Sequence, residues 1–138
     1  MEFHSLHLPN FWGSALVNGD YSGLEEEDIK ELNSNVVLCF NMIHISPWNS
    51  TVGLFEGAHK ILNGDEFLML YGPFKENDEH ISESNHHFDL NLRSQNSAWG
   101  VRNLQTVIQL ALRYQFCLEV KQPMPANNLS VLFRRMSA

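Results

Sequence analysis

The sequence predicts an α/β protein whose sheet contains parallel strands. Two apolar runs, at residues 36–40 and 67–71, have the length of strands and show no alternation with polar residues. Between these runs, residues 51–62 carry apolar side chains at the spacing of one helical face. A strand, a helix and a second strand in this order are typical of a right-handed crossover between parallel strands.

The first run, VVLCF, is continuous, so both faces of this strand are expected to be buried. Its carboxyl end is followed by polar side chains at Asn41, His44 and Ser46 and by a large aromatic one at Trp48. Ligands of open α/β sheets bind just beyond the carboxyl ends of the strands. This order therefore predicts a candidate site, and the alternative is a buried strand with a capped turn after it.

The crossover helix has candidate caps in Asn49 and Ser50 and is expected to end in a left-handed turn at residues 63–64. Its expected buried stripe consists of Leu54, Phe55, Ala58, Ile61 and Leu62. Ahead of the first strand, a capping-box pattern at residues 22–25 predicts a short helix over residues 24–32.

Downstream, polar residues 75–83 predict a loop, and Ser84 is the expected cap of a short helix. Asn103 is the expected cap of a second amphipathic helix, whose apolar stripe comprises Leu104, Val107, Ile108 and Ala111. The last two strands are expected at residues 116–120, where prolines then break the strand, and at residues 129–133.

Composition and charge exclude several classes of protein. The 138 residues are enough for one domain and too few for two. The net charge is -7 and no basic run exists beyond Arg134 and Arg135, so nucleic acid is not an expected partner. No membrane-spanning stretch or signal peptide is visible. Cys39 and Cys117 lie in apolar runs and are expected to be free thiols of an intracellular protein. The expected location is the cytoplasm, and the nucleus is a second expected location.

Seven histidines raise the question of a metal site, and the spacing argues against one. His86 and His87 are adjacent, so on a helix their side chains diverge by about 100° and cannot chelate one ion together. The sequence has no CxxC pair, no GxSxG and no GxxxxGKS. We therefore expect neither a metal centre nor a nucleophilic triad.

What remains is a rim of polar and aromatic residues at strand ends. These residues are Asn41, His44 and Trp48 after the first strand, Tyr71 and Phe74 after the second, and Asn127 and Asn128 before the last. Such a rim is suited to positioning a small-molecule substrate, with His44 as general base. The alternative is that His44 is a satisfied core histidine and that the asparagines form turns.

Six segments carry a resemblance to a known family. They are NMIHISPW (41–48), GLFEGAHKIL (53–62), LYGPF (70–74), SNHHFDLNLR (84–93), AWGVRNL (98–104) and MPANNLSVLFR (124–134). In this order they resemble the methyltransferase-like 26 family, which is similar to class I S-adenosylmethionine-dependent methyltransferases.

The resemblance implies a Rossmann-like sheet with strand order 3-2-1-4-5-7-6, in which strand 7 is antiparallel. The four strands expected here, from residue 36 onwards, would be strands 4, 5, 6 and 7 in chain order. Residues 1–138 would then form a single, incomplete domain, with an irregular segment at 1–34 and a family-like core at 35–138. Asn41 and Met42 match the family motif that lies near S-adenosylmethionine, so the resemblance implies that they contact this cofactor.

The family also has strand 1 with its glycine-rich turn and an acidic residue after strand 2, and this chain matches neither. We therefore expect a fragment or a shortened relative that is inactive alone and binds S-adenosylmethionine weakly or not at all. Two function classes follow, namely a truncated methyltransferase for small molecules and a non-catalytic interaction protein that retains half of the fold. Without strand 1, the strand at residues 36–41 has an unpaired edge, which predicts self-association.

Overall fold

The computed structural model describes residues 35–137, so the predictions for residues 1–34, including the helix at 24–32, lie outside the described part. The described elements are β1 (Val36–Phe40), the 3-10 helix η1 (Ile43–Ile45), α3 (Trp48–Ile61), β2 (Phe67–Gly72), β3 (Phe74–Glu76), β4 (Glu79–His80), α4 (Glu83–Gln95), β5 (Arg102–Asn103), α5 (Leu104–Arg113), β6 (Phe116–Met124), η2 (Pro125–Asn127) and β7 (Asn128–Arg135).

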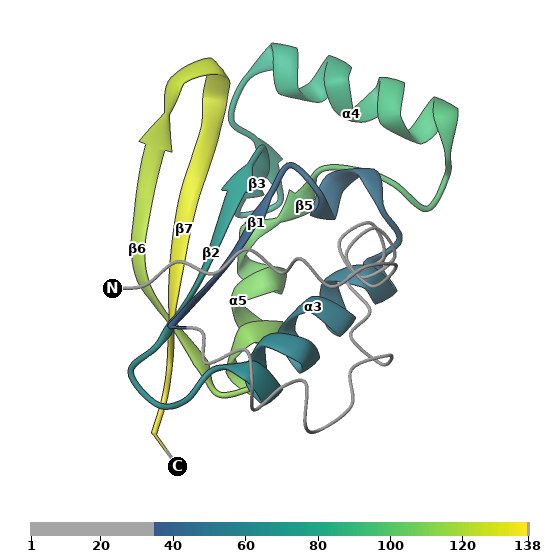
Figure 1. Cartoon of the computed structure of the whole chain (residues 1–138). Helices are drawn as coiled ribbons and strands as arrows, with labels where there is room; N and C mark the ends of the chain where they lie inside the picture. Colours follow the sequence, from purple (N-terminus) through teal and green to yellow (C-terminus); the bar gives the residue numbers. More distant parts are fainter. Residues whose placement is uncertain (1–34, 138) are drawn as a thin grey trace.

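The main sheet has the strand order β1-β2-β7-β6 (Figure 1). β1 and β2 are parallel, and β7 runs antiparallel to both β2 and β6. This is the predicted order 4-5-7-6 with an antiparallel last strand, so the fold-class prediction is confirmed. A second, small sheet of order β4-β3-β5 lies at the end of the main sheet from which α4 departs.

Helices α3 and α5 lie on the same side of the main sheet in Figure 1, and the core forms between them and the strands. The ring of Phe55 on α3 meets the rings of Phe116 and Phe133 edge to face, at centroid distances of 5.8 and 5.5 Å. Such T-shaped pairs add about 0.5–1.5 kcal/mol each to the effect of burial. The aromatic contacts fix the crossover helix against β6 and β7.

The expectation that both faces of β1 are buried is wrong. Val37 and Cys39 point into the core, whereas Leu38 is 39% exposed and Phe40 is 54% exposed. The reason is that α3 and α5 cover one face of the sheet, and nothing in residues 35–137 covers the other in the same way. β1 is also the edge strand of the described sheet, with β2 as its only described partner.

Two helix boundaries differ from the sequence prediction. α3 begins at Trp48 because Pro47 takes the N-cap position, with φ −61° and ψ 154°. α3 ends without the predicted left-handed turn at 63–64, since Leu62 is extended and Asp65 has the positive φ instead. By contrast, α5 has Asn103 at its N-cap position as predicted, although no side-chain hydrogen bond forms there.

β6 continues to Met124, so the prediction that prolines end this strand near Val120 is wrong. Pro123 pairs with Leu129 in the antiparallel ladder, and β6 is an edge strand of the described sheet, where a missing N–H is tolerated. The expected loop at 75–83 contains parts of β3 and the whole of β4. No helix in residues 35–137 is long and apolar enough to span a bilayer.

Candidate functional site

The loop after β1 turns sharply at Asn41, which has a φ of +54°. Its backbone N–H donates to the carbonyl of Tyr71 at 2.8 Å, which ties the end of β1 to the end of β2. The next residues form η1, and the Ser46 hydroxyl closes the turn by donating to the Met42 carbonyl at 2.9 Å. The chain therefore reverses within a few residues and presents Asn41 and His44 at the carboxyl end of the parallel pair.

Arg102 holds this loop from the side. Its guanidinium donates to the carbonyls of Ser46 and Ala98, both at 2.8 Å, and its Nε lies 3.4 Å from the Ile43 carbonyl. The same guanidinium lies over the ring of Trp48, 5.7 Å from its centroid. Three carbonyls and an aromatic face give the cation a fixed position, because guanidinium donors form a rigid planar fork. Arg102 is therefore a positioning residue for the His44 loop.

His44 itself is only 4% exposed. Its carbonyl accepts a hydrogen bond from the Gly100 N–H at 3.0 Å, and its ring meets Phe88 edge to face at a centroid distance of 5.6 Å. Burial, together with the positive charge of Arg102, lowers the pKa of His44 to about 4. The imidazole is therefore neutral at pH 7. Its Nδ1 is buried and has no hydrogen-bond partner among the described residues.

Gly72 brings Asn41 and His44 together at the end of β2. A Cβ at this position would lie 3.4 Å from Asn41 Oδ1 and 3.5 Å from His44 Nδ1. The φ of Gly72 is also +154°, which residues with side chains rarely adopt. These distances are ordinary van der Waals contacts, so the positive φ, and not a lack of space, favours glycine at this position.

Tyr71 and Asn128 form the next part of the rim. The Asn128 Nδ2 donates to the Tyr71 hydroxyl at 3.3 Å, and the Tyr71 ring meets Phe40 edge to face at 5.7 Å. Asn127 contributes through its backbone, since its carbonyl accepts from Asn85 Nδ2 at 3.1 Å. Asn128, the first residue of β7, is therefore linked to β2, and Asn127 just before it is linked to α4.

α4 extends across this rim. Figure 1 shows it at the end of the sheet where β1 leads into the η1 turn. Ser82 caps the helix by accepting from the Asn85 N–H at 3.0 Å. Near its start α4 contacts Asn127 through Asn85, and one turn further Phe88 reaches His44. The helix buries few of its own residues, and the Phe88 ring is 42% exposed.

Asp89 fastens α4 to the loop before β5. Its buried carboxylate accepts from the Val101 N–H at 2.8 Å and from Arg93 Nε at 3.2 Å, and it lies 3.4 Å from His80 Nε2. Burial alone would raise the pKa of Asp89, but the hydrogen bonds from Val101 and Arg93 outweigh it and hold this pKa below its usual value. Because the adjacent Gly100 donates to His44, Asp89 connects α4 to the His44 backbone.

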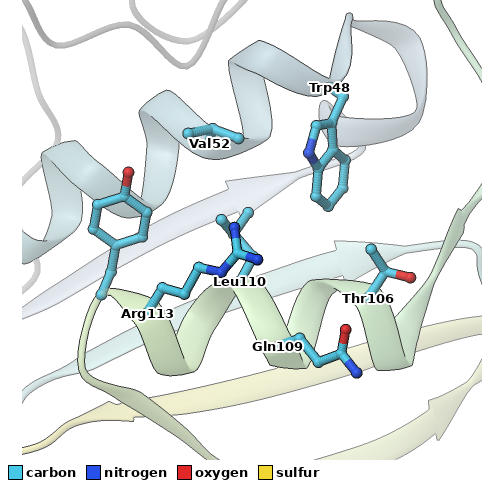
Figure 2. Close-up of a pocket in the computed structure, with 7 residues that line it drawn as sticks. Trp48, Val52, Thr106, Gln109, Leu110 and Arg113 are labelled. Carbon is cyan, nitrogen blue, oxygen red and sulfur yellow. The ribbon is translucent and has the colours of Figure 1, made fainter.

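Three predicted site residues lie elsewhere. Phe74 is completely buried in the core and cannot line an open rim. Met42 is buried, and its sulfur lies 3.2 Å from the Ser46 hydroxyl. Trp48 lies in a groove between α3 and α5 (Figure 2). Sequence reasoning missed the roles of Arg102 and Phe88, because only the fold brings them to the loop after β1.

A family model described as "Protein of unknown function (DUF938)" matches residues 17–135. The chain belongs to the DUF938 family. The match covers the whole of the described sheet and the rim.

Solved structures with a similar fold include methyltransferases. The DUF938 chain is similar to human N-acetylserotonin methyltransferase in complex with SAM, with a TM-score of 0.67 and 12% identity over 76% of this chain. It is also similar to the pyocyanin biosynthetic protein PhzM, with a TM-score of 0.62 and 17% identity over 82%. An O-methyltransferase family protein from Burkholderia thailandensis gives a TM-score of 0.66 and 10% identity over 83%.

These similarities show the methyltransferase fold. The matches cover 30%, 34% and 34% of the three solved chains, so the DUF938 chain spans about a third of their length. The part it shares is the four-stranded portion of the sheet described above.

The described rim consists of polar and aromatic side chains at the ends of β1 and β2. Asn41 is exposed at the end of β1, and the first carboxylates after β2 are Glu76 in β3 and Asp78 in the turn that follows it. No group of three or more His, Cys, Asp or Glu residues in this range could hold a metal ion. The arrangement instead offers a neutral imidazole, an amide and an aromatic ring around one strand end.

Proposed function

We propose that this chain is the acceptor-binding part of an S-adenosylmethionine-dependent methyltransferase that acts on a small molecule. The observation that carries the proposal is His44, a neutral histidine at the end of a parallel strand whose Nδ1 has no described partner. A satisfied core histidine would be equally buried, but its ring nitrogens would have partners. An unfilled acceptor at this place in an α/β sheet is suited to a substrate hydroxyl.

The chemistry assigned to His44 is proton transfer. A neutral imidazole accepts the proton of the acceptor hydroxyl while the oxygen attacks, and the cofactor supplies the methyl group. Burial and, to a smaller extent, the charge of Arg102 keep the histidine neutral, and the Arg102 guanidinium fixes its loop. Since His44 is almost completely buried, an acceptor reaches it only when Phe88 and α4 move aside. In this proposal α4 is a lid.

The remaining rim residues would contact the acceptor around His44. Tyr71 and Asn128 form one wall, linked by their 3.3 Å hydrogen bond, and Asn127 joins this wall to the lid. Asn41 and Met42 would lie toward S-adenosylmethionine, with Asn41 as the exposed contact and Met42 as a buried support. Trp48 would act through Arg102, on which its ring is stacked.

The domain is incomplete in this proposal, with residues 35–138 as its core. The described sheet has four strands, and β1 carries an open edge where strand 1 of a Rossmann-like methyltransferase would pair. The six segments quoted above support the finer assignment to the methyltransferase-like 26 family. A longer protein that adds the glycine-rich turn and the ribose-binding acid would complete the cofactor site.

The test is transfer of a labelled methyl group from S-adenosylmethionine. A longer family member would be prepared with residues 17–135 replaced by those of this chain, and incubated with a cell extract cleared of macromolecules. We expect label in one or a few small-molecule products. Label that enters no small molecule, although the longer protein binds S-adenosylmethionine, would contradict the proposal and favour a non-catalytic interaction protein.

A further inference from the structure

A groove of about 470 Å³ lies between α3 and α5, on the helical side of the molecule and away from His44 (Figure 2). Its volume is within the range of small-molecule sites in proteins, which is roughly 300–1,000 Å³. Trp48 and Val52 of α3 form one wall, and Leu110 of α5 lies opposite them. None of Asn41, His44, Tyr71 or Asn128 lines it, so the groove is separate from the rim.

The groove has an apolar interior that the core keeps in place. Leu110 is buried, and Trp48, Val52 and Tyr114 are half-buried residues packed against the core cluster. These residues therefore contact the core with one side and line the groove with the other. Arg102 also lies over the Trp48 ring, which fixes the indole at one end of the groove. A rigid apolar wall of this kind favours a flat hydrocarbon body.

Among residues 35–137, Arg113 is the only charged residue that lines the groove, and no acidic residue of this range lines it. Arg113 is an exposed residue of the groove lining, and in Figure 2 its side chain extends from α5 in the direction of Leu110. Arg113 forms no salt bridge with any described residue. The described lining of the groove therefore carries a positive charge, although the net charge of the chain is -7.

We propose that this groove binds a small carboxylate with a flat apolar body. The body lies between Trp48, Val52 and Leu110, and the carboxylate pairs with the Arg113 guanidinium, which can donate two parallel hydrogen bonds. Gln109 and Thr106, which line the groove on α5, offer further hydrogen-bond donors. A singly charged carboxylate matches the groove better than a doubly charged phosphate, because Arg113 is the only cation among its described lining residues.

The test compares two probes that differ in charge alone. 3-Phenylpropionate and its neutral amide would be titrated into the full chain, with binding followed by saturation-transfer NMR on the ligand, which also works for self-associated protein. We expect saturable binding of the carboxylate and at least about tenfold weaker binding of the amide, which is ~1.4 kcal/mol. Arg113→Gln should weaken the carboxylate by a similar factor without changing the melting temperature, because Arg113 is exposed.

Lys60→Gln is the matched control, since Lys60 is an exposed cation on α3 that does not line the groove. It should leave the affinity within about twofold, which is ~0.4 kcal/mol. Val52→Glu adds a carboxylate to the wall of the groove. This change should weaken the binding of 3-phenylpropionate more than the binding of its amide. Failure of the acid to bind, equal affinity for acid and amide, or full retention of binding by Arg113→Gln would each overturn the proposal.

Discussion

Acidification should destabilise this fold through His44. In the folded chain its pKa is about 4, mainly because of burial, whereas an unfolded histidine has its ordinary value of 6.5. Between these two values the unfolded chain binds a proton that the folded chain does not. The stability contributed by the neutral histidine is therefore fully present above pH 6.5 and is lost as the pH falls toward 4.

The size of the effect follows from these two pKa values. At pH 5 the unfolded histidine is almost fully protonated and the folded one is about nine-tenths neutral, which corresponds to about 2 kcal/mol of unfolding free energy. His80 also has a lowered pKa, caused first by burial, so it acts in the same direction. The contribution of His44 must therefore be isolated by comparison with a variant.

The assay is urea unfolding of wild type and His44→Gln at pH 7.5 and pH 5.0, with the protein dilute enough to limit association. Wild type should lose about 2 kcal/mol more than the variant between the two pH values, and the exposed-site control His87→Gln should behave as wild type. Ring-proton NMR should place the His44 midpoint near pH 4. A midpoint near 6.5, or equal losses in wild type and His44→Gln, would refute the burial argument.

Three further outcomes are expected. Calorimetry should find that S-adenosylmethionine binds this chain two to four orders of magnitude more weakly than it binds a full-length relative. The reason is that the glycine-rich turn and the ribose-binding acid would each contribute about 1.5–3 kcal/mol to binding. Micromolar binding would contradict this expectation. Size exclusion with light scattering should show species heavier than one chain. Phe40→Lys in β1, whose only described partner is β2, should lower the fraction of these heavier species. A stable monomer would disprove association through β1. Asp89→Asn should lower the unfolding free energy by about 2 kcal/mol, while Asn91→Asp on the exposed face of α4 should change it little; equal effects would mean that Asp89 does not fasten α4.

The strands could be predicted from the sequence because their signals are local, whereas the strand order was implied by the family resemblance. Continuous apolar runs marked β1 and β2, and the apolar stripe of α5 from Leu104 to Ala111 marked its buried face. The extra length of β6 could not be predicted, since Pro123 is compatible with a strand only at an edge, and edge position is a property of the assembled sheet. The exposure of Leu38 and Phe40 likewise depends on which face the helices cover.

The site was predictable only in part. Asn41, His44 and Tyr71 could be placed at one rim, because the carboxyl ends of parallel strands meet there. Phe74 is the first residue of β3, two positions after the end of β2, and its side chain is buried in the core. The apolar pattern of the sequence does not show in which direction this side chain points. Arg102 and Phe88 are more than forty positions from His44 in the sequence, so only the tertiary fold reveals that they contact its loop.

Turnover of the longer family member carrying residues 17–135 of this chain provides the decisive comparison. If His44 takes the acceptor proton, His44→Gln should lower kcat by about 10²–10⁴-fold, while the melting temperature and the affinity for S-adenosylmethionine stay nearly unchanged. His87→Gln, an exposed histidine on α4, should retain wild-type kcat. An unchanged kcat per folded molecule in His44→Gln, with only the melting temperature lowered, would show that His44 is a core residue and that the chemistry lies elsewhere.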